Sequence, residues 1–172
     1  PNPYSHDFCG TCHKCIQICP TQAIEAERVL NANKCISYLT IEAKTVPPVE
    51  IRKKMGDWFF GCDLCQTVCP WNQKIFGGSL STENLQTQND QQNIAMESEL
   101  KDILNFSSKK IEQKYQYSPL ARARGFGLKR NALIVIANRK IISLKSEIEE
   151  FISTNQNNDL VDLAKWTLKE LS

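Results

Sequence analysis

The sequence of 172 residues has no uninterrupted apolar run of about eighteen residues, so it offers no transmembrane helix. Its first residues, Pro-Asn-Pro-Tyr, lack the basic and apolar regions of a signal peptide. We therefore expect a cytoplasmic monomer without membrane association. An initiator Met is also missing, and the first cysteine is already residue 9, which suggests that the chain is part of a larger protein.

Histidine is scarce, with two residues, whereas the chain has eight cysteines. The first four cysteines have a metal-ligand spacing, with three placed two residues apart and the last before a proline: Cys9, Cys12, Cys15 and Cys19. Bacterial-type ferredoxins hold cubane 4Fe-4S clusters with this spacing, and the cysteine before the proline binds the other cluster. His6 and His13 lie beside this run but are not needed once four cysteines are counted.

The second cysteine run, which contains Cys62, Cys65 and Cys69, lacks one member. Phe59 stands at the position where a full copy of the first run would begin. Cys35 is the cysteine that remains to complete the set. One cluster is therefore predicted to take Cys9, Cys12, Cys15 and Cys69. The other is predicted to take Cys62, Cys65, Cys35 and the crossing Cys19.

Zinc and disulfides are the alternatives for these cysteines. A disulfide framework would suit a secreted chain, but four cysteines within eleven residues favour a metal site. Zinc usually takes its thiolates in Cys-x2-Cys pairs, and a triple repeat is awkward for it. The spacing favours two 4Fe-4S clusters over both.

Charge is unevenly distributed along the chain. The formal net charge is +2, yet residues 109–140 carry nine Lys or Arg against Glu112 alone. Residues 78–108 carry one Lys against five acids. A basic segment in a chain of low net charge is a candidate surface for a polyanion, although such segments are often only solvated.

The pattern predicts a mainly α chain. A short helix is expected after Pro20, and a helical turn over residues 49–54. From residue 100 onward, apolar stripes predict helices, and the helix over 129–138 is apolar on nearly all sides and needs neighbours on both flanks. Short connections favour an antiparallel helical stack. The expected units are a cluster module (1–77), a polar linker (78–96) and a helical domain (97–172).

Several motifs together resemble the epoxyqueuosine reductase family. In the cysteine region they are Cys9-Gly-Thr-Cys, Cys19-Pro-Thr, Cys35-Ile-Ser-Tyr-Leu-Thr-Ile-Glu42, Phe60-Gly-Cys-Asp63 and Cys65-Gln-x-Val-Cys-Pro-Trp-Asn72. In the tail they are Ser118-Pro-Leu-x-Arg122, Gly127-Leu-x-Arg-Asn131, and Asp159-Leu-Val followed by Ala164-x-Trp-x-Leu168. The resemblance implies a two-cluster, bacterial ferredoxin-like module followed by a HEAT-like helical domain.

The family resemblance also implies a function. Such enzymes reduce the epoxide of epoxyqueuosine in the tRNA anticodon to give queuosine, and two 4Fe-4S clusters relay electrons from a donor to cobalamin. Ser37, Cys62 and Asp63 match positions at the corrin-facing edge. The family's amino-terminal domain, with most of the cobalamin pocket and the catalytic acid, has no counterpart here. No catalytic residue is therefore assigned.

The basic segment is the predicted tRNA contact, with Arg122, Arg124, Lys129 and Arg130 as its strongest members. Glycines at 125 and 127 are expected to let the backbone approach a phosphate, and Lys129 and Arg130 to stand at a helix start. Two rival functions stay open at this point. One is a ferredoxin-type electron-transfer module with a protein-interaction tail, and the other is a cobalamin enzyme similar to reductive dehalogenases.

Overall fold

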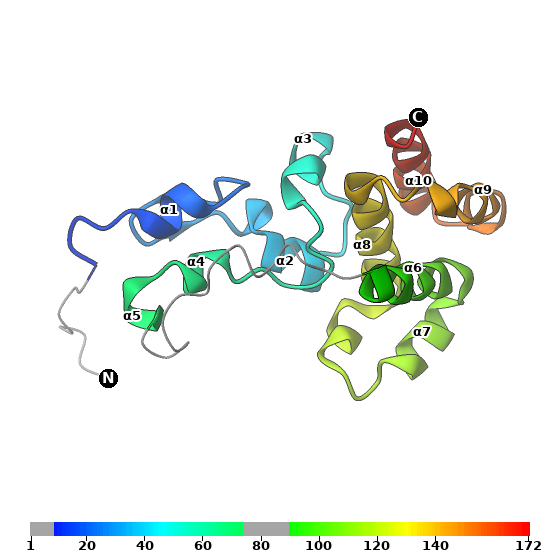
Figure 1. Cartoon of the computed structure of the whole chain (residues 1–172), viewed down its shortest axis with the longest axis horizontal. Coiled ribbons are helices and arrows are strands. Elements are labelled where there is room, and N and C mark those ends of the chain that lie inside the picture. Colours follow the sequence, from blue (N-terminus) through cyan, green and yellow to red (C-terminus); the bar gives the residue numbers. More distant parts are fainter. Residues whose placement is uncertain (1–8, 74–89) are drawn as a thin grey trace.

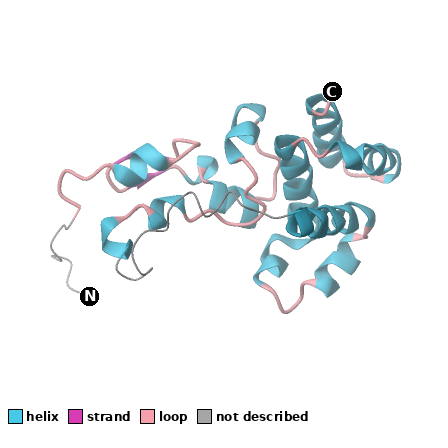
Figure 2. Cartoon of the chain, in the orientation of Figure 1, coloured by secondary structure: helices cyan, strands magenta, loops and turns pink. Residues whose placement is uncertain are grey.

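Figure 1 shows a computed structural model of the chain, which describes residues 9–73 and 90–172. The amino-terminal elements are short: α1 (Lys14–Ile18), β1 (Ile24–Ala26), β2 (Val29–Leu30), α2 (Ile36–Ile41), α3 (Val49–Arg52), α4 (Leu64–Thr67) and α5 (Pro70–Gln73). The carboxy-terminal elements are α6 (Asp90–Asn105), α7 (Ser108–Lys114), α8 (Arg124–Arg139), α9 (Lys145–Thr154) and α10 (Asn158–Glu170). Helices dominate, as Figure 2 shows, and the predicted mainly α class is confirmed.

The helix expected after Pro20 is not formed, and a small strand pair stands there instead. Ile24 of β1 lies opposite Leu30 of β2 in an antiparallel ladder. Gln22 and Arg28 have positive φ angles of 53° and 60°, which a right-handed helix does not allow. The sulfur of Cys19 also accepts a hydrogen bond from the Ala23 N–H at 3.2 Å. This N–H therefore donates to a side chain and not to a carbonyl oxygen one helical turn earlier.

Helix α8 lies at the centre of the carboxy-terminal part and packs against α10, α7, α6 and α2 (Figure 1). The prediction that this helix needs neighbours on both flanks is confirmed. It begins at Arg124 rather than at Lys129, so the two glycines lie in its first turn and do not end the preceding segment. The Gly125 N–H faces the carboxylate of Glu112 at 3.4 Å, which places an acid at this helix start.

The other predicted helical stripes also form. Leu100, Ile103 and Leu104 are buried on α6, and Leu160 and Leu163 are buried on α10. The predicted turn over 49–54 is α3 followed by a 3₁₀ turn over Lys53–Met55. None of the helices within residues 9–73 and 90–172 has both the length and the apolar character needed to cross a membrane.

One hydrophobic core joins residues on both sides of the predicted linker. Ile36, Leu39 and Met55, from the cysteine region, belong to the same buried cluster as Leu133 and Ile136 of α8. Helix α6 begins at Asp90, inside the predicted linker, and the rest of that linker up to residue 89 lies outside the described residues. The three domain boundaries stay a prediction.

Polar side chains of α8 fasten it to the cysteine region. Asn138 Nδ2 donates to the carbonyl oxygens of Arg52 at 2.8 Å and Gly56 at 2.6 Å. Gly56 has a φ of +58°, in the left-handed region that glycine adopts without strain, so its carbonyl can turn toward α8. These bonds satisfy carbonyl groups on either side of the 3₁₀ turn Lys53–Met55, which packs against α8.

Candidate cluster-binding site

The first cysteine run forms a loop that leads into α1. The Cys12 N–H donates to the Cys9 carbonyl oxygen at 3.0 Å, and Gly10 between them has a φ of +50°. Cys9 and Cys12 are exposed, whereas Cys15, within α1, and Cys19, directly after it, are half-buried. The loop thus presents several thiols over a short length of chain, as a cubane cluster requires.

The second cysteine run lies beside the first, because α4 packs against α1. Cys62 and Cys65 flank the start of α4, and Cys69 precedes α5, which begins at Pro70. Cys35 arrives from a third segment, where it stands at the N-cap position of α2. Three segments far apart in the sequence therefore bring their thiols together.

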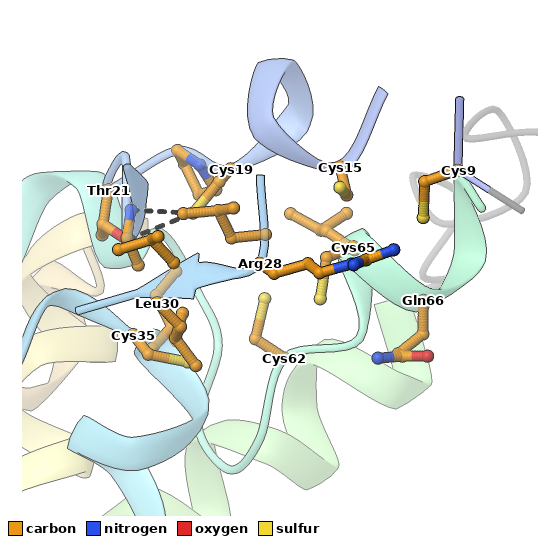
Figure 3. A pocket seen from close by; sticks show the side chains of 16 residues that line it. Cys9, Cys15, Cys19, Thr21, Arg28, Leu30, Cys35, Cys62, Cys65 and Gln66 are labelled. Carbon is orange, nitrogen blue, oxygen red and sulfur yellow. Dashed lines mark hydrogen bonds between the residues drawn. The ribbon is translucent and has the colours of Figure 1, made fainter. Parts of the chain in front are cut away.

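Two adjacent cavities are lined by the cysteines. The first, of about 360 Å³, is lined by six of them: Cys9, Cys15, Cys19, Cys35, Cys62 and Cys65. The second, of about 450 Å³, is lined by five: Cys9, Cys12, Cys15, Cys65 and Cys69. Figure 3 shows Cys15 and Cys19 on one side of the first cavity and Cys62 on the other, with Arg28 reaching between them.

This grouping agrees with the ligand sets expected from the sequence. All four predicted ligands of one cluster, Cys19, Cys35, Cys62 and Cys65, line the first cavity. The four predicted for the other cluster, Cys9, Cys12, Cys15 and Cys69, line the second. Some cysteines border both cavities, so the assignment of individual ligands stays a prediction.

The arrangement of the thiols bears on the choice between clusters, zinc and disulfides. Within the described residues, no disulfide joins the cysteines. Within the described part of the chain, no three His, Cys, Asp or Glu side chains converge as the ligands of one metal ion do. Zinc would need its thiolates about 2.3 Å from a single point. A cubane core instead holds thiolates at its separate corners, which suits side chains spread around a cavity.

The thiols of the first cavity also affect one another electrostatically. Burial raises the pKa of Cys62, and the neighbouring Cys65, Cys35 and Cys19 raise this pKa further. Burial would also raise the pKa of Cys19, but hydrogen bonds from Thr21 and Ala23 outweigh it and lower this pKa. Several thiolates can therefore share this space only if a cationic group neutralises them, which an iron-sulfur core would do.

Comparison with known proteins agrees with this site. Residues 8–72 match the family described as a 4Fe-4S double cluster binding domain. The epoxyqueuosine reductase of Cyclobacterium marinum is 39% identical over 130 residues, which cover 76% of this chain and 39% of that protein. The chain is similar to one part of the epoxyqueuosine reductases. It spans about two fifths of the length of the curated relatives that it matches.

Solved structures of epoxyqueuosine reductases share the fold as well. The enzyme from Bacillus subtilis superposes with a TM-score of 0.76 at 30% identity, over 98% of this chain and 43% of that one. A crystal structure of an epoxyqueuosine reductase with an epoxyqueuosine-modified tRNA-Tyr stem loop gives a TM-score of 0.65 at 25% identity. That match covers 97% of this chain and 51% of the other. The resemblance thus extends through the helical part.

The structure corrects two of the four predicted phosphate contacts. Arg130 is 0% exposed, and its Nη1 donates to the carbonyl oxygens of Ala43 at 2.5 Å and Thr45 at 3.1 Å. Lys129 is 7% exposed, and its ammonium lies 5.2 Å from the centre of the Phe151 ring. Both side chains point into the packed interior around α8, because α8 begins earlier than expected and has neighbours at these positions. Neither is placed to meet a phosphate.

The other two predicted contacts do lie at the surface. Arg122 is exposed in the 3₁₀ turn Pro119–Ala123, and its Nε pairs with Glu42 Oε1 at 2.5 Å. Arg124 is exposed at the start of α8. An exposed ion pair of this kind is weak enough to exchange its carboxylate for a phosphate.

The predicted corrin-facing residues Ser37 and Asp63 lie near the first cavity without lining it, whereas Cys62 is part of its wall. Ser37 is half-buried on α2, two residues after Cys35, and Asp63 is exposed beside Cys62. Asp63 occupies the N-cap position of α4, yet its side chain makes no capping hydrogen bond. Its carboxylate is therefore not engaged by the helix that it precedes.

Some residues of the site were missed from the sequence. Arg28 lines the first cavity from the turn between β1 and β2 and brings a positive charge to a site expected to hold an anionic cluster. Thr21 is buried beside Cys19. The Thr that follows Cys19-Pro was visible as a motif residue, but nothing in the pattern linked Arg28 to the cysteines.

Proposed function

We propose that this chain is the electron-relay and tRNA-contacting part of an epoxyqueuosine reductase. The observation that carries the proposal is the pair of adjacent cysteine cavities in a chain about 40% identical, over about three quarters of its length, to enzymes of that name. The full activity is that of a longer protein, because the chain spans less than half of its relatives. We place it in the cytoplasm, as a monomer that receives electrons from a separate donor.

The residues of this chain would hold two 4Fe-4S clusters close together. Cys9, Cys15 and Cys65 border both cavities, so groups bound there would be neighbours. When bound, the clusters supply electrons one at a time. Reduction of an epoxide consumes two electrons, and two adjacent one-electron centres suit that requirement. The apolar side chains of Ile24 and Ile36 line the first cavity and would limit its access to water.

Cobalamin is the expected acceptor of these electrons, and most of its pocket would come from residues outside this chain. Ser37, Cys62 and Asp63 are the proposed corrin-facing edge. The carboxylate of Asp63 is exposed and makes no capping hydrogen bond to α4, so a polar group is available at the rim of the cluster site. This observation supports the assignment. When bound, the reduced cobalt supplies the nucleophilic and electron-donating chemistry that amino-acid side chains lack.

The tRNA contact is proposed for the exposed basic residues of the helical part. Arg122 and Arg124 lie at the surface, and Lys109 and Lys110 are exposed at the start of α7. The similar epoxyqueuosine reductase whose crystal structure includes a tRNA stem loop supports a nucleic-acid partner for this chain. The burial of Lys129 and Arg130 makes this surface smaller than the charge count suggests.

The proposal is tested with the natural full-length protein. We expect anaerobic enzyme, supplied with a reductant and cobalamin, to convert epoxyqueuosine in tRNA to queuosine. The isolated chain should bind iron but should not convert the tRNA, because it lacks most of the cobalamin pocket. Full-length protein that is loaded with clusters and cobalamin and still leaves epoxyqueuosine unchanged would contradict the proposed function.

A further inference from the structure

The hydroxyl group of Thr40 joins the two segments that carry Cys35 and Cys62. Thr40 is 0% exposed on α2, the helix that Cys35 precedes. Its Oγ1 donates to the Ile36 carbonyl oxygen at 2.7 Å and accepts a hydrogen bond from the Gly61 N–H at 2.9 Å. A threonine hydroxyl has one hydrogen to donate and lone pairs to accept, so both of its capacities are used here.

The bond to Gly61 acts directly beside a predicted cluster ligand. Gly61 precedes Cys62 and has a φ of +76°, a conformation that glycine adopts readily. A side chain at this position would meet no atom within 4 Å, so packing at Gly61 itself does not fix its backbone, although Phe60 and Cys62 on either side pack against the core. The hydrogen bond to Thr40 is the polar contact made by Gly61 itself, and it helps to set the direction in which the chain enters Cys62.

Asn131 of α8 holds the same two segments from the other side. It is 1% exposed, and its Nδ2 donates to the carbonyl oxygens of Thr40 and Phe59, each at 2.8 Å. Its Oδ1 accepts from Arg130 Nε at 3.1 Å. An amide nitrogen has two hydrogens, and each is committed to one segment. The helical part thus clamps α2 and the 59–61 loop together.

We propose that Thr40 and Asn131 are positioning residues for the cluster bound by Cys19, Cys35, Cys62 and Cys65. Thr40 fixes the spacing between the Cys35 and Cys62 thiols, and Asn131 makes α8 part of the support of that cluster. The other cluster, predicted on Cys9, Cys12, Cys15 and Cys69, makes no use of this pair. The inference rests on the proposed two-cluster function.

The structure offers a matched control for a purely structural effect. Thr167 of α10 is also 0% exposed, and its hydroxyl lies within hydrogen-bond distance of the carbonyl oxygens of Leu133 at 3.1 Å and Leu163 at 3.0 Å. Replacing either threonine by valine keeps the shape and removes a buried hydroxyl. Only the change at Thr40 leaves an N–H beside a predicted cluster ligand without its partner.

The test compares Thr40→Val, Thr40→Ser and Thr167→Val in the full-length protein, purified anaerobically. Iron content, the electron paramagnetic resonance spectrum and the midpoint potential of each cluster are measured. Thr40→Val should alter the signal and potential of one cluster and lose up to half of the iron, about four of eight atoms. Thr40→Ser should restore both clusters, and Thr167→Val should keep them. Asn131→Asp, which replaces a donor by an acceptor, should affect the same cluster as Thr40→Val.

Two results would overturn the inference. One is a Thr40→Val protein whose two clusters keep the wild-type spectra and potentials. The other is a change that affects both clusters equally, or that Thr167→Val reproduces. If Thr40→Val does not fold, Thr40→Ala carries the test, and failure of both to fold while Thr167→Val folds would assign Thr40 to folding alone. A wild-type protein without iron would instead contradict the proposed function.

Discussion

The guanidinium group of Arg130 donates from Nη1 to the carbonyl oxygen of Ala43 at 2.5 Å, just beyond the end of α2. Arg130 was predicted from the sequence to belong to a basic surface, but it is a buried residue that links the helical part to the cysteine region by hydrogen bonds. Burial lowers the pKa of Arg130 to about 10, so the group is still charged at neutral pH. Its charge is met by carbonyl oxygens rather than by a carboxylate.

Replacing Arg130 should therefore reduce stability. Arg130→Met leaves the Ala43 and Thr45 carbonyl groups without their donor, which should lower the free energy of unfolding by about 1–3 kcal/mol, partly offset because a buried charge is removed. Arg122→Ala, at an exposed ion pair, should change it by less than about 1 kcal/mol. Anaerobic denaturant unfolding measures both. Equal effects of the two substitutions would contradict the buried role of Arg130.

The exposed arginines should instead control tRNA binding. Removal of Arg122 and Arg124 together should reduce the slope of log affinity against log salt by up to about two, because each phosphate left without its arginine lowers the slope by somewhat under one. The weakening should be similar for different tRNA sequences, because backbone charge carries no base information. Arg130→Met should leave the slope unchanged. If the double variant keeps wild-type affinity and slope, this surface does not bind tRNA.

Gly125 should be intolerant of a side chain. A Cβ atom there would lie 2.5 Å from the Ser108 Cβ and 2.6 Å from its Cα, so α7 would have to move. Gly125→Ala should destabilise the fold by about 1–3 kcal/mol, although alanine favours helices. Gly127→Ala is the control, because its nearest neighbour would be Ala123 Cβ at 3.1 Å and the change should cost less. Thermal unfolding of both variants checks this, and a Gly125→Ala protein as stable as wild type would refute the close packing.

Serine substitutions test the crossing of ligands between the two runs. Cys69→Ser lies in the second run but should disturb the cluster held by Cys9, Cys12 and Cys15, because Cys69 lines their cavity. Cys35→Ser should disturb the other cluster, since Cys35 lines only the first of the two cavities. Electron paramagnetic resonance of the two single variants distinguishes the clusters. Loss of the same signal in both would show that the ligand sets are assigned wrongly.

The sequence was informative where local spacing decides the outcome. Cysteine spacing predicted which thiols line a common cavity, and apolar stripes located α6, α9 and α10. The apolar stripes and the spacing within each cysteine run depend on neighbours in the sequence, so they can be read without the fold. Cys35 was added to its set because it was the cysteine that remained.

The sequence was misleading where tertiary contacts decide. Lys129 and Arg130 look like surface residues, but α8 has neighbours on nearly every side and takes their side chains inward. The polar Asn131 within an apolar helix was the available hint, since a buried amide needs partners on other segments. The helix predicted after Pro20 was wrong for a related reason. The backbone of this segment instead donates a hydrogen bond to the Cys19 sulfur and pairs with the strand at Leu30.

Iron, sulfide and zinc analysis of the anaerobically purified chain tests the central claim most directly. Two 4Fe-4S clusters predict a brown protein with about eight irons and about eight acid-labile sulfides per chain, whose visible absorption bleaches on reduction. Its paramagnetic signals after reduction should report two centres close enough to interact. A colourless chain that contains zinc and no labile sulfide would contradict the account.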